Sequence, residues 1–522
     1  MLTKRTPPLL KSAIMLGIAI MLSRIVGFAR EITLATFHGA DIVSDAFILA
    51  LTIPDSLIVF IGSAVAASFI PMYHRVKKHT NFTRNIMTCV LVIGLAFSII
   101  FTIFPGVLVR LFAFQLEPET FEIAVFFVRY MVWTASFNLL MDVYNAYLEI
   151  KGAFFSAGIR VLWRNLVVVI GLVLGYINDY NLIVALSPVV GSALSLFVLS
   201  IISRKYGYTY KPQMDINSSD LKQVMALVVP MFFASASGQL NMIVSKNFAA
   251  TLPVGSISYL NYSSRVAGLF GALFGSTLYT VLYPHISMLA VSNDLTKFKS
   301  VLTRGIMYMT AIMLPLSIGL IVLAEPGMRI LFERGYFTAI DTVQTASILR
   351  MYAGLVLFGS IKPLIVRGFY AVQDTKTPAK ISIAGVAVSV LLHYILLDYL
   401  GVKGLALATS LAGGLTMLLQ MVFLRRKLGC LGLRSNLPEF FKLLLATLSM
   451  GGFVWLASDM LPLTAVPVWK SVLLCFVVIT LGVAVYGILL LVMKNRLALE
   501  AFRSVANLSK VGKLVKLGRF NK

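Results

Sequence analysis

Two arginines, Arg24 and Arg30, interrupt the first long apolar stretch of the chain, which runs from about residue 9 to residue 37. A charged side chain at the centre of a bilayer costs roughly 2.5–3.5 kcal/mol on insertion scales, so such residues usually face a wet cavity or a partner. Arginine presents a planar fork of donors that matches two phosphate oxygens, and it keeps its charge. The first chemistry that the sequence suggests is therefore binding of an anion inside a membrane bundle.

The spacing of these two arginines suits an anion held between them. At 100° per residue, Arg24 and Arg30 lie about 120° apart around a helix, and Gly27 lies midway between them. Glycine at that position permits close approach of the backbone or a bend. We therefore place Gly27 with the two arginines in a candidate phosphate-binding face.

Further charged residues in apolar stretches complete the candidate site. Arg265 and Lys246 offer cationic groups from the second half of the chain, and Asp45 and Glu31 are carboxylates near the first two apolar segments. Asp45, close to the outer end of the second apolar segment, is either a simple helix-entry residue or, as we prefer, the partner of one of the arginines. A second interpretation stays open, in which the arginines are buried ion-pair struts that hold helices together.

The composition places these residues in a polytopic membrane protein. The chain of 522 residues is 59% hydrophobic and only 13% charged, with a mean hydropathy of +0.89. No soluble domain of this size has such values, so an all-α membrane protein is predicted. About fourteen transmembrane helices are expected, near residues 9–37, 42–73, 84–113, 121–148, 156–177, 181–203, 220–251, 255–290, 302–324, 340–371, 379–398, 402–424, 438–458 and 466–493.

The positive charges fix the expected orientation. Most Lys and Arg residues fall in alternate loops and in the two ends of the chain, which the positive-inside rule places in the cytoplasm. Arg160 and Arg164 are counted with these loop charges. The net charge of +24 is then explained by topology and anionic lipid headgroups, so membrane lipids rather than nucleic acid are the expected partners. The opposite loops hold only Arg110, Arg329, Arg334, Lys403 and Lys470.

The chain contains a weak internal repeat. Pro105-Gly106 before VLVRLF recurs as Pro326-Gly327 before MRILF, and Arg129 in FFVRYM recurs as Arg350 in SILRMY at the same separation. Such similarity between halves is typical of transporters built from repeats, here parallel ones because each half begins and ends in the cytoplasm. The three cysteines show no metal or disulfide spacing, and no cofactor is expected.

The repeat predicts two lobes of six helices, followed by two further helices and a basic tail that forms an amphipathic helix on the inner leaflet or a solvated extension. The predicted parts are an N-terminal lobe at 1–203, a cytoplasmic linker at 204–219, a C-terminal lobe at 220–424, helices thirteen and fourteen at 425–493, and the cytoplasmic tail at 494–522.

Six motifs in fixed order resemble the MurJ/MviN family of lipid II flippases, which belongs to the multidrug/oligosaccharidyl-lipid/polysaccharide exporter superfamily. They are SRIVGFARE from Ser23, SDAF from Ser44, SFIP ending at Pro71, ILFERGYFT from Ile330, RGFYAVQDTKTP from Arg367 and GVKGLALATSLA from Gly401.

The resemblance implies a transporter rather than an enzyme. It implies transfer of an undecaprenyl-diphosphate-linked peptidoglycan precursor from the inner to the outer leaflet of the bacterial inner membrane by alternating access. It implies cavity charges at Arg24, Arg30, Asp45 and Arg265, and a groove for the lipid tail at helices thirteen and fourteen. The expected partners are the lipid-linked glycan and, as a further candidate, cell-wall assembly proteins. The coupling ion is undetermined.

The sequence departs from the family pattern in the second helix. The family typically continues as PNLLRR and then an EGAF-like run, whereas this chain reads PDSLIVFIGSAVA from Pro54. Ile58 and Val59 stand where arginine is expected, and Ser63 stands near the acidic position. Another polyprenyl-diphosphate-linked glycan is therefore an alternative substrate. Asp55 and Asp142 are candidate proton or ion sites.

Three rival functions follow from other interpretations of the same charges. A cation-coupled multidrug exporter would need an acidic cavity, whereas the charges within the helices here are mostly basic. A membrane glycosyltransferase or polymerase would need a convergent acid/base or metal site, and the sequence has no DxD or HExxH motif. A scaffold for cell-wall assembly requires that the arginines be structural.

Overall fold

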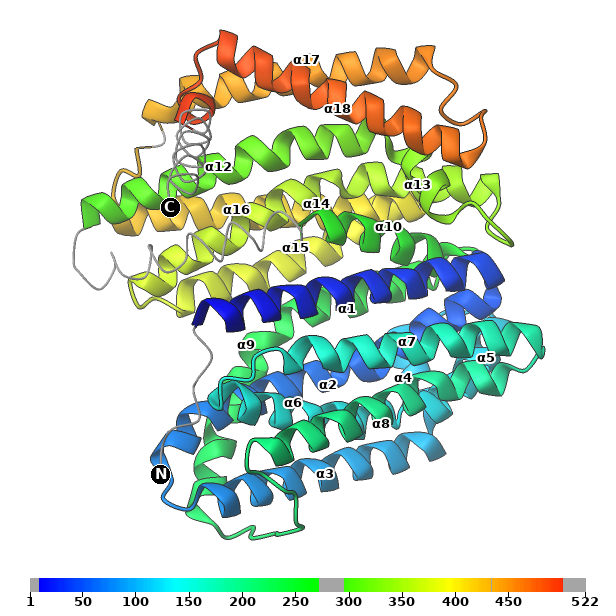
Figure 1. The fold of residues 1–522 in the computed structure, drawn as a ribbon, viewed down its shortest axis with the longest axis vertical. Helices are drawn as coiled ribbons and strands as arrows, with labels where there is room; N and C mark the ends of the chain where they lie inside the picture. The colour runs from blue at the N-terminus through cyan, green and yellow to red at the C-terminus, as the bar shows by residue number, and fades with distance from the viewer. Residues whose placement is uncertain (1–8, 272–294, 433, 501–522) are drawn as a thin grey trace, which may run out of the picture. The chain divides into compact units, whose positions relative to one another are not determined.

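The computed structural model of the chain describes residues 9–271, 295–432 and 434–500, and within helices it leaves out the side chains of residues 9–16, 58–60, 229–238 and 295. Every regular element in these ranges is a helix, as Figure 1 shows. The prediction of an all-α membrane protein is therefore confirmed.

Contacts between helices divide the chain into two compact units. The first unit comprises residues 1–262 and 332–341, and the second comprises residues 263–331 and 342–522. The predicted lobes at 1–203 and 220–424 follow the sequence repeat instead, and they stay a prediction.

The first unit is built from nine helices wholly within the described residues and the start of a tenth. In this unit α7 lies beside both α1 and α8, and α2 packs against α5, α6 and α9. The bounds are α1 Leu9–His38, α2 Ile42–Arg75, α3 His79–Ile103, α4 Pro105–Phe112, α5 Pro118–Met131, α6 Thr134–Ile150, α7 Ser156–Ile177, α8 Asn181–Lys205, α9 Ser219–Ala249 and α10 Ser256–Phe270.

The second unit continues α10 and contains the remaining helices. Among them α15 packs along α16, and α17 packs along both α12 and α18. The bounds are α12 Leu295–Val322, α13 Ala324–Phe332, α14 Ala339–Ala371, α15 Lys376–Leu400, α16 Val402–Leu428, the short 3₁₀ helix η2 Arg434–Asn436, α17 Leu437–Met460 and α18 Val468–Val492.

The apolar stretches form helices close to the predicted limits, with two informative breaks. The stretch predicted as one span at 84–113 ends as α3 and restarts as α4, with Pro105 at the first position of α4, where a missing N–H does no harm. The stretch at 121–148 is divided into α5 and α6, which meet at an angle of 44°.

Ten helices in the described residues are long and apolar enough to cross a membrane, or eleven if α5 and α6 are one bent span. The chain is therefore a multi-pass membrane protein. The expected total of about fourteen spans includes residues 272–294, which lie outside the described ranges, so this number stays a prediction. The expected orientation of the two ends also stays a prediction.

The repeat motif produces the same local structure in both halves. PGVLVRLF forms the short helix α4 after α3, and AEPGMRILF forms the short helix α13 after α12. Arg350, one of the repeat arginines, lies 3.5 Å from Glu325 of α13 through its Nη2 atom. This contact fits a structural role for Arg350.

The segment between α8 and α9 is fastened along α3 rather than free. Asn85 bonds to both backbone groups of Asp215, donating to its oxygen at 2.9 Å and accepting from its N–H at 2.8 Å. Tyr208 is buried beside Tyr144 and Tyr147 of α6. The segment predicted as a linker therefore packs against α3 and α6 of the first unit.

The predicted amphipathic tail begins as a helix. Asn495 caps it, because its Oδ1 atom accepts from the N–H groups of Leu497 at 3.0 Å and Ala498 at 3.3 Å. Glu439 of α17 accepts from the N–H of Arg496 at 3.0 Å, which fastens the tail to α17. Residues 501–522 lie outside the described ranges.

Candidate functional site

Arg30 and Glu31 form a deeply buried ion pair in the first unit. Their side chains are 7% and 3% exposed, and Nη2 of Arg30 contacts Oε1 of Glu31. Nη1 of Arg30 also donates to Oδ1 of Asn165 on α7 at 3.0 Å. Asn261 of α10 donates to Oε2 of Glu31 at 2.9 Å. The pair thus ties α1 to α7 and α10, which is the arrangement expected of a strut.

Gly27 and Arg24 lie about one and two turns before this pair on α1. Arg24 is partly exposed, in contrast to Arg30. A Cβ atom on Gly27 would lie 3.1 Å from Nδ2 of Asn165, so glycine makes room for the amide that holds Arg30. Gly27 therefore allows α1 to pack closely against α7. Of the two arginines, Arg24 is the more accessible.

Asp45 contacts the start of α10 rather than an arginine. Its side chain is 3% exposed and accepts hydrogen bonds from the N–H groups of Gly255 at 2.8 Å and Ser258 at 2.7 Å, and from the Ser258 hydroxyl. A carboxylate at a helix N-terminus satisfies free N–H groups and complements the helix dipole. The expected pairing of Asp45 with a cavity arginine is wrong for this conformation: the carboxylate caps α10.

The two remaining predicted cations differ in exposure. Lys246 is buried near the end of α9 in the first unit. Arg265 is exposed on the part of α10 that belongs to the second unit. Within the first unit the structure thus joins Arg30 and Glu31 in one network and leaves Asp45 in another. The role of the seven predicted residues in substrate binding stays a prediction.

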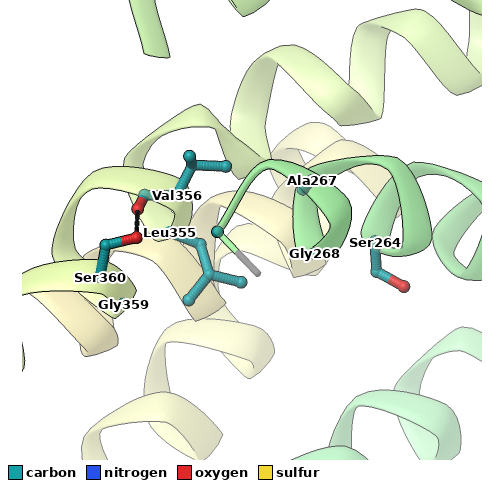
Figure 2. A pocket seen from close by; sticks show the side chains of 8 residues that line it. Ser264, Ala267, Gly268, Leu355, Val356, Gly359 and Ser360 are labelled. Atoms are coloured by element: carbon teal, nitrogen blue, oxygen red, sulfur yellow. Dashed lines mark hydrogen bonds between the residues drawn. The ribbon is translucent and has the colours of Figure 1, made fainter. Parts of the chain in front are cut away.

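A small cavity of about 190 Å³ adjoins Arg265 along the chain, between α10 and α14 (Figure 2). Its walls are glycine, serine and aliphatic side chains, and the Ser360 hydroxyl donates to the oxygen of Val356 at 2.7 Å. The walls of the cavity therefore carry no charged side chain. It is lined by Ser264, Ala267, Gly268, Gly271, Leu355, Val356, Gly359 and Ser360.

Two further ion pairs of the first unit escaped the sequence reasoning. Arg164 on α7 donates to Oδ1 of Asp55 on α2 at 2.8 Å, and Asn138 of α6 donates to the same oxygen at 3.2 Å. Arg160, one turn earlier on α7, pairs with Asp142 of α6. Both arginines were counted as loop charges, although they lie inside α7. The signal in the sequence was the presence of Asp55 and Asp142 in apolar helices, because a buried carboxylate needs a cationic partner.

The motif ILFERGYFT is explained by a loop that returns to the end of α1. The N–H of Tyr336 donates to the oxygen of Thr36 at 2.9 Å. Gly335 has a φ of +59°, and a Cβ atom there would lie 2.1 Å from the same oxygen. Asp341 then accepts from the Thr338 N–H at 2.7 Å and from the Tyr259 hydroxyl at 2.6 Å. The motif therefore packs this loop against the end of α1.

The motif RGFYAVQDTKTP ends in a capped turn between α14 and α15. Lys427 donates to Oδ2 of Asp374 at 2.7 Å, and the N–H of Thr377 donates to Oδ1 at 3.0 Å. These contacts, the Lys427 bond first, hold the pKa of Asp374 well below its usual range. The carboxylate is thus charged, and it joins α15 to the end of α16.

The sequence of the chain is similar to those of curated lipid II flippases. The chain is 29% identical over 521 residues to the "Probable lipid II flippase MurJ" of Vibrio cholerae, covering 94% of this chain and 97% of that protein. It is 27% identical over 509 residues to the "Lipid II flippase MurJ" of Burkholderia cenocepacia, covering 88% and 94%.

Solved structures agree with the fold. The structure "Lipid II flippase MurJ, inward closed conformation" matches with a TM-score of 0.80 and 25% identity, covering 93% of this chain and 99% of that one. An inward-facing multidrug resistance MATE transporter matches at 0.66 with 15% identity over 80% of this chain and 98% of that one, which shows a shared fold. Residues 34–488 match the family described as "Lipid II flippase MurJ". The chain belongs to the MurJ family of lipid II flippases.

Proposed function

We propose that this chain is a flippase that moves lipid II, the undecaprenyl-diphosphate-linked peptidoglycan precursor, from the inner to the outer leaflet of the bacterial inner membrane. The observation that carries the proposal is the match to the MurJ family over residues 34–488, together with relatives named for this activity along nearly their whole length. Basic residues within the apolar helices suit the diphosphate of such a substrate.

The mechanism we propose is alternating access. Arg24, which is partly exposed, and Arg265, which is exposed, bind the diphosphate while the polyprenyl tail stays in lipid. Arg30, Glu31 and Asp45 keep the helices around them in place through the contacts described above. Lys246 and Gly27 serve the same site, Lys246 as a further cation and Gly27 by bringing α1 close to α7.

The membrane potential provides one source of energy for this cycle. We place both ends of the chain in the cytoplasm, because the basic loops fall on that side. An inside-negative potential favours outward movement of an anion by about 2.3 kcal/mol per charge per 100 mV. Outward transfer of the anionic headgroup is therefore favoured, and collapse of the potential should slow transport.

The proposal is tested by complementation. A bacterial host is depleted of its own lipid II flippase, and the native chain is expressed in its place. We expect growth to be restored by the native chain and not by an Arg24→Ala/Arg265→Ala variant that reaches the membrane in equal amount. Failure of the native chain, when it is inserted normally, would contradict lipid II transport.

A second candidate substrate is another polyprenyl-diphosphate-linked glycan. The departure at Ile58 and Val59 favours it, since arginine is expected there in the family. The side chains of residues 58–60 lie outside the described ranges. The Ile58→Arg variant separates the two candidate substrates. If the missing cation limits transport of lipid II, this variant should complement the depleted host better than the native chain does. Interaction with cell-wall assembly proteins is a further proposal that copurification from the host would test.

A further inference from the structure

The arginines of α7 are more exposed than Arg30. The side chains of Arg160 and Arg164 are 25% and 17% exposed, and those of their partners Asp142 and Asp55 are 17% and 30% exposed. The pair of Arg30 and Glu31 is almost closed by comparison. Part of each α7 pair therefore stays accessible, whereas the pair of Arg30 and Glu31 does not.

The two α7 arginines are also well placed to act together. Residues four apart on a helix lie on one face with Cβ atoms about 6 Å apart, so the two arginine side chains start from the same face of α7. Each fork can hold two oxygens of a phosphate. A diphosphate carries its oxygens on two adjacent phosphorus atoms, so two arginines on one helix face can each take one of its phosphates, which a single arginine cannot do.

The backbone that carries these arginines is fixed. The Ser195 hydroxyl of α8 donates to the oxygen of Arg160 at 3.0 Å. A Cβ atom on Gly191 of α8 would lie 2.8 Å from the oxygen of Arg164, so glycine permits close contact of the two helices at that position. The arginine side chains therefore extend from a rigid helix, and little ordering is needed when a ligand binds.

The carboxylate partners come from two other helices and occupy the same forks that an anion would use. Asp55 lies on α2, with Asn138 of α6 bonded to the same carboxylate oxygen. Asp142 lies on α6 against Gly62 of α2, where a Cβ atom would come within 1.8 Å of its Oδ2 atom. Carboxylate and phosphate oxygens compete for a guanidinium group through the same donors.

We propose that Arg160 and Arg164 form a second anion-binding station in the first unit, which takes the diphosphate group of a lipid-linked substrate, with Asp142 and Asp55 as resident counter-ions that the diphosphate displaces. The identity of the lipid-linked substrate rests on the proposed function, whereas binding of a diphosphate does not. Removal of a resident counter-ion should strengthen binding, which a purely structural ion pair does not predict.

Binding is measured by calorimetric titration of the purified full chain in detergent with two probes. Inorganic pyrophosphate reports a free anion, and farnesyl diphosphate reports a diphosphate attached to a lipid. Each titration is repeated in an Arg24→Ala/Arg265→Ala background, which removes binding at the site of the proposed function. In that background we expect Arg160→Gln/Arg164→Gln to weaken binding at least tenfold and Asp55→Asn to strengthen it severalfold. Tighter binding of farnesyl diphosphate than of pyrophosphate assigns the station to lipid headgroups, and equal binding assigns it to diphosphate in general.

Two controls separate binding from folding. Arg110→Gln removes an exposed arginine from α4 of the same unit and should leave affinity unchanged. Asp55→Asn/Arg164→Gln removes a whole ion pair without leaving one charge behind, so it should melt close to the native temperature and still bind weakly. Unchanged affinity in Arg160→Gln/Arg164→Gln, or no gain in Asp55→Asn, would overturn the proposal. Either result leaves complementation by the native chain untouched, so failure of the station and failure of lipid II transport are distinguishable.

Discussion

Replacement of Asp45 by alanine is expected to lower the melting temperature of the purified protein by about 3–5 °C and to abolish transport. The carboxylate is buried and accepts from two backbone N–H groups and one hydroxyl at the start of α10. A buried donor left without a partner costs about 1–3 kcal/mol, so the loss should reach roughly 3–5 kcal/mol. Thermal unfolding in detergent, followed by size-exclusion chromatography, measures the effect.

Asp41 provides the matched control for Asp45. It lies four residues earlier and caps α2 by accepting from the Ser44 N–H at 2.8 Å. Loss of one N-cap costs about 1 kcal/mol, so Asp41→Ala should have a smaller effect than Asp45→Ala. Asp45→Asn keeps an acceptor for Ser258 and should fall between the two. Equal melting temperatures of Asp41→Ala and Asp45→Ala would contradict the role of Asp45 as the anchor of α10.

Replacement of Arg30 by alanine is the second change with a large expected effect. It leaves the carboxylate of Glu31 buried without its guanidinium partner, and breaking a buried pair in this way costs roughly 3–5 kcal/mol. We expect a clear fall in melting temperature and little protein in the membrane. The Arg30→Ala/Glu31→Ala variant removes both charges of this pair, so it should recover part of the lost stability although it lacks both residues.

The Arg24→Ala variant distinguishes the substrate-binding role of Arg24 from the structural role of Arg30 on the same helix. Arg24 is partly exposed, so its removal should leave the melting temperature within about 2 °C of the native value. Transport should nevertheless be lost, since Arg24 is a proposed ligand of the diphosphate. Normal transport by Arg24→Ala would remove it from the site, and a normal melting temperature of Arg30→Ala would show that the buried pair is not a strut.

The helices were predictable because they depend on local sequence. Long apolar runs give a hydrogen-bonded helix in a membrane whatever their neighbours are, so the limits of α1, α7 and α18 agree with prediction within a few residues. The repeat around Pro105 and Pro326 was also visible in sequence and forms a short helix in each half. Division of the 84–113 stretch at Pro105 was missed, although proline at the first turn of a helix is its usual position.

The partners of the charged residues were not predictable, because they lie far apart along the chain. Asp45 bonds to Ser258, and Asp55 bonds to Arg164, and no periodicity links either pair. A count of loop charges also assigned Arg160 and Arg164 to the membrane surface. In α7 each of them instead meets a carboxylate from another helix, which the positive-inside rule cannot reveal because it counts charges and not contacts.

Outward transfer of lipid II is measured most directly by the amount of lipid II that is accessible at the outer leaflet. Spheroplasts of a host depleted of its own flippase are treated with an enzyme that cleaves only exposed lipid II, and the cleaved fraction is quantified. We predict that the native chain restores this fraction and that Arg24→Ala/Arg265→Ala does not. An unchanged fraction, with the native chain inserted at a normal level, would contradict the account.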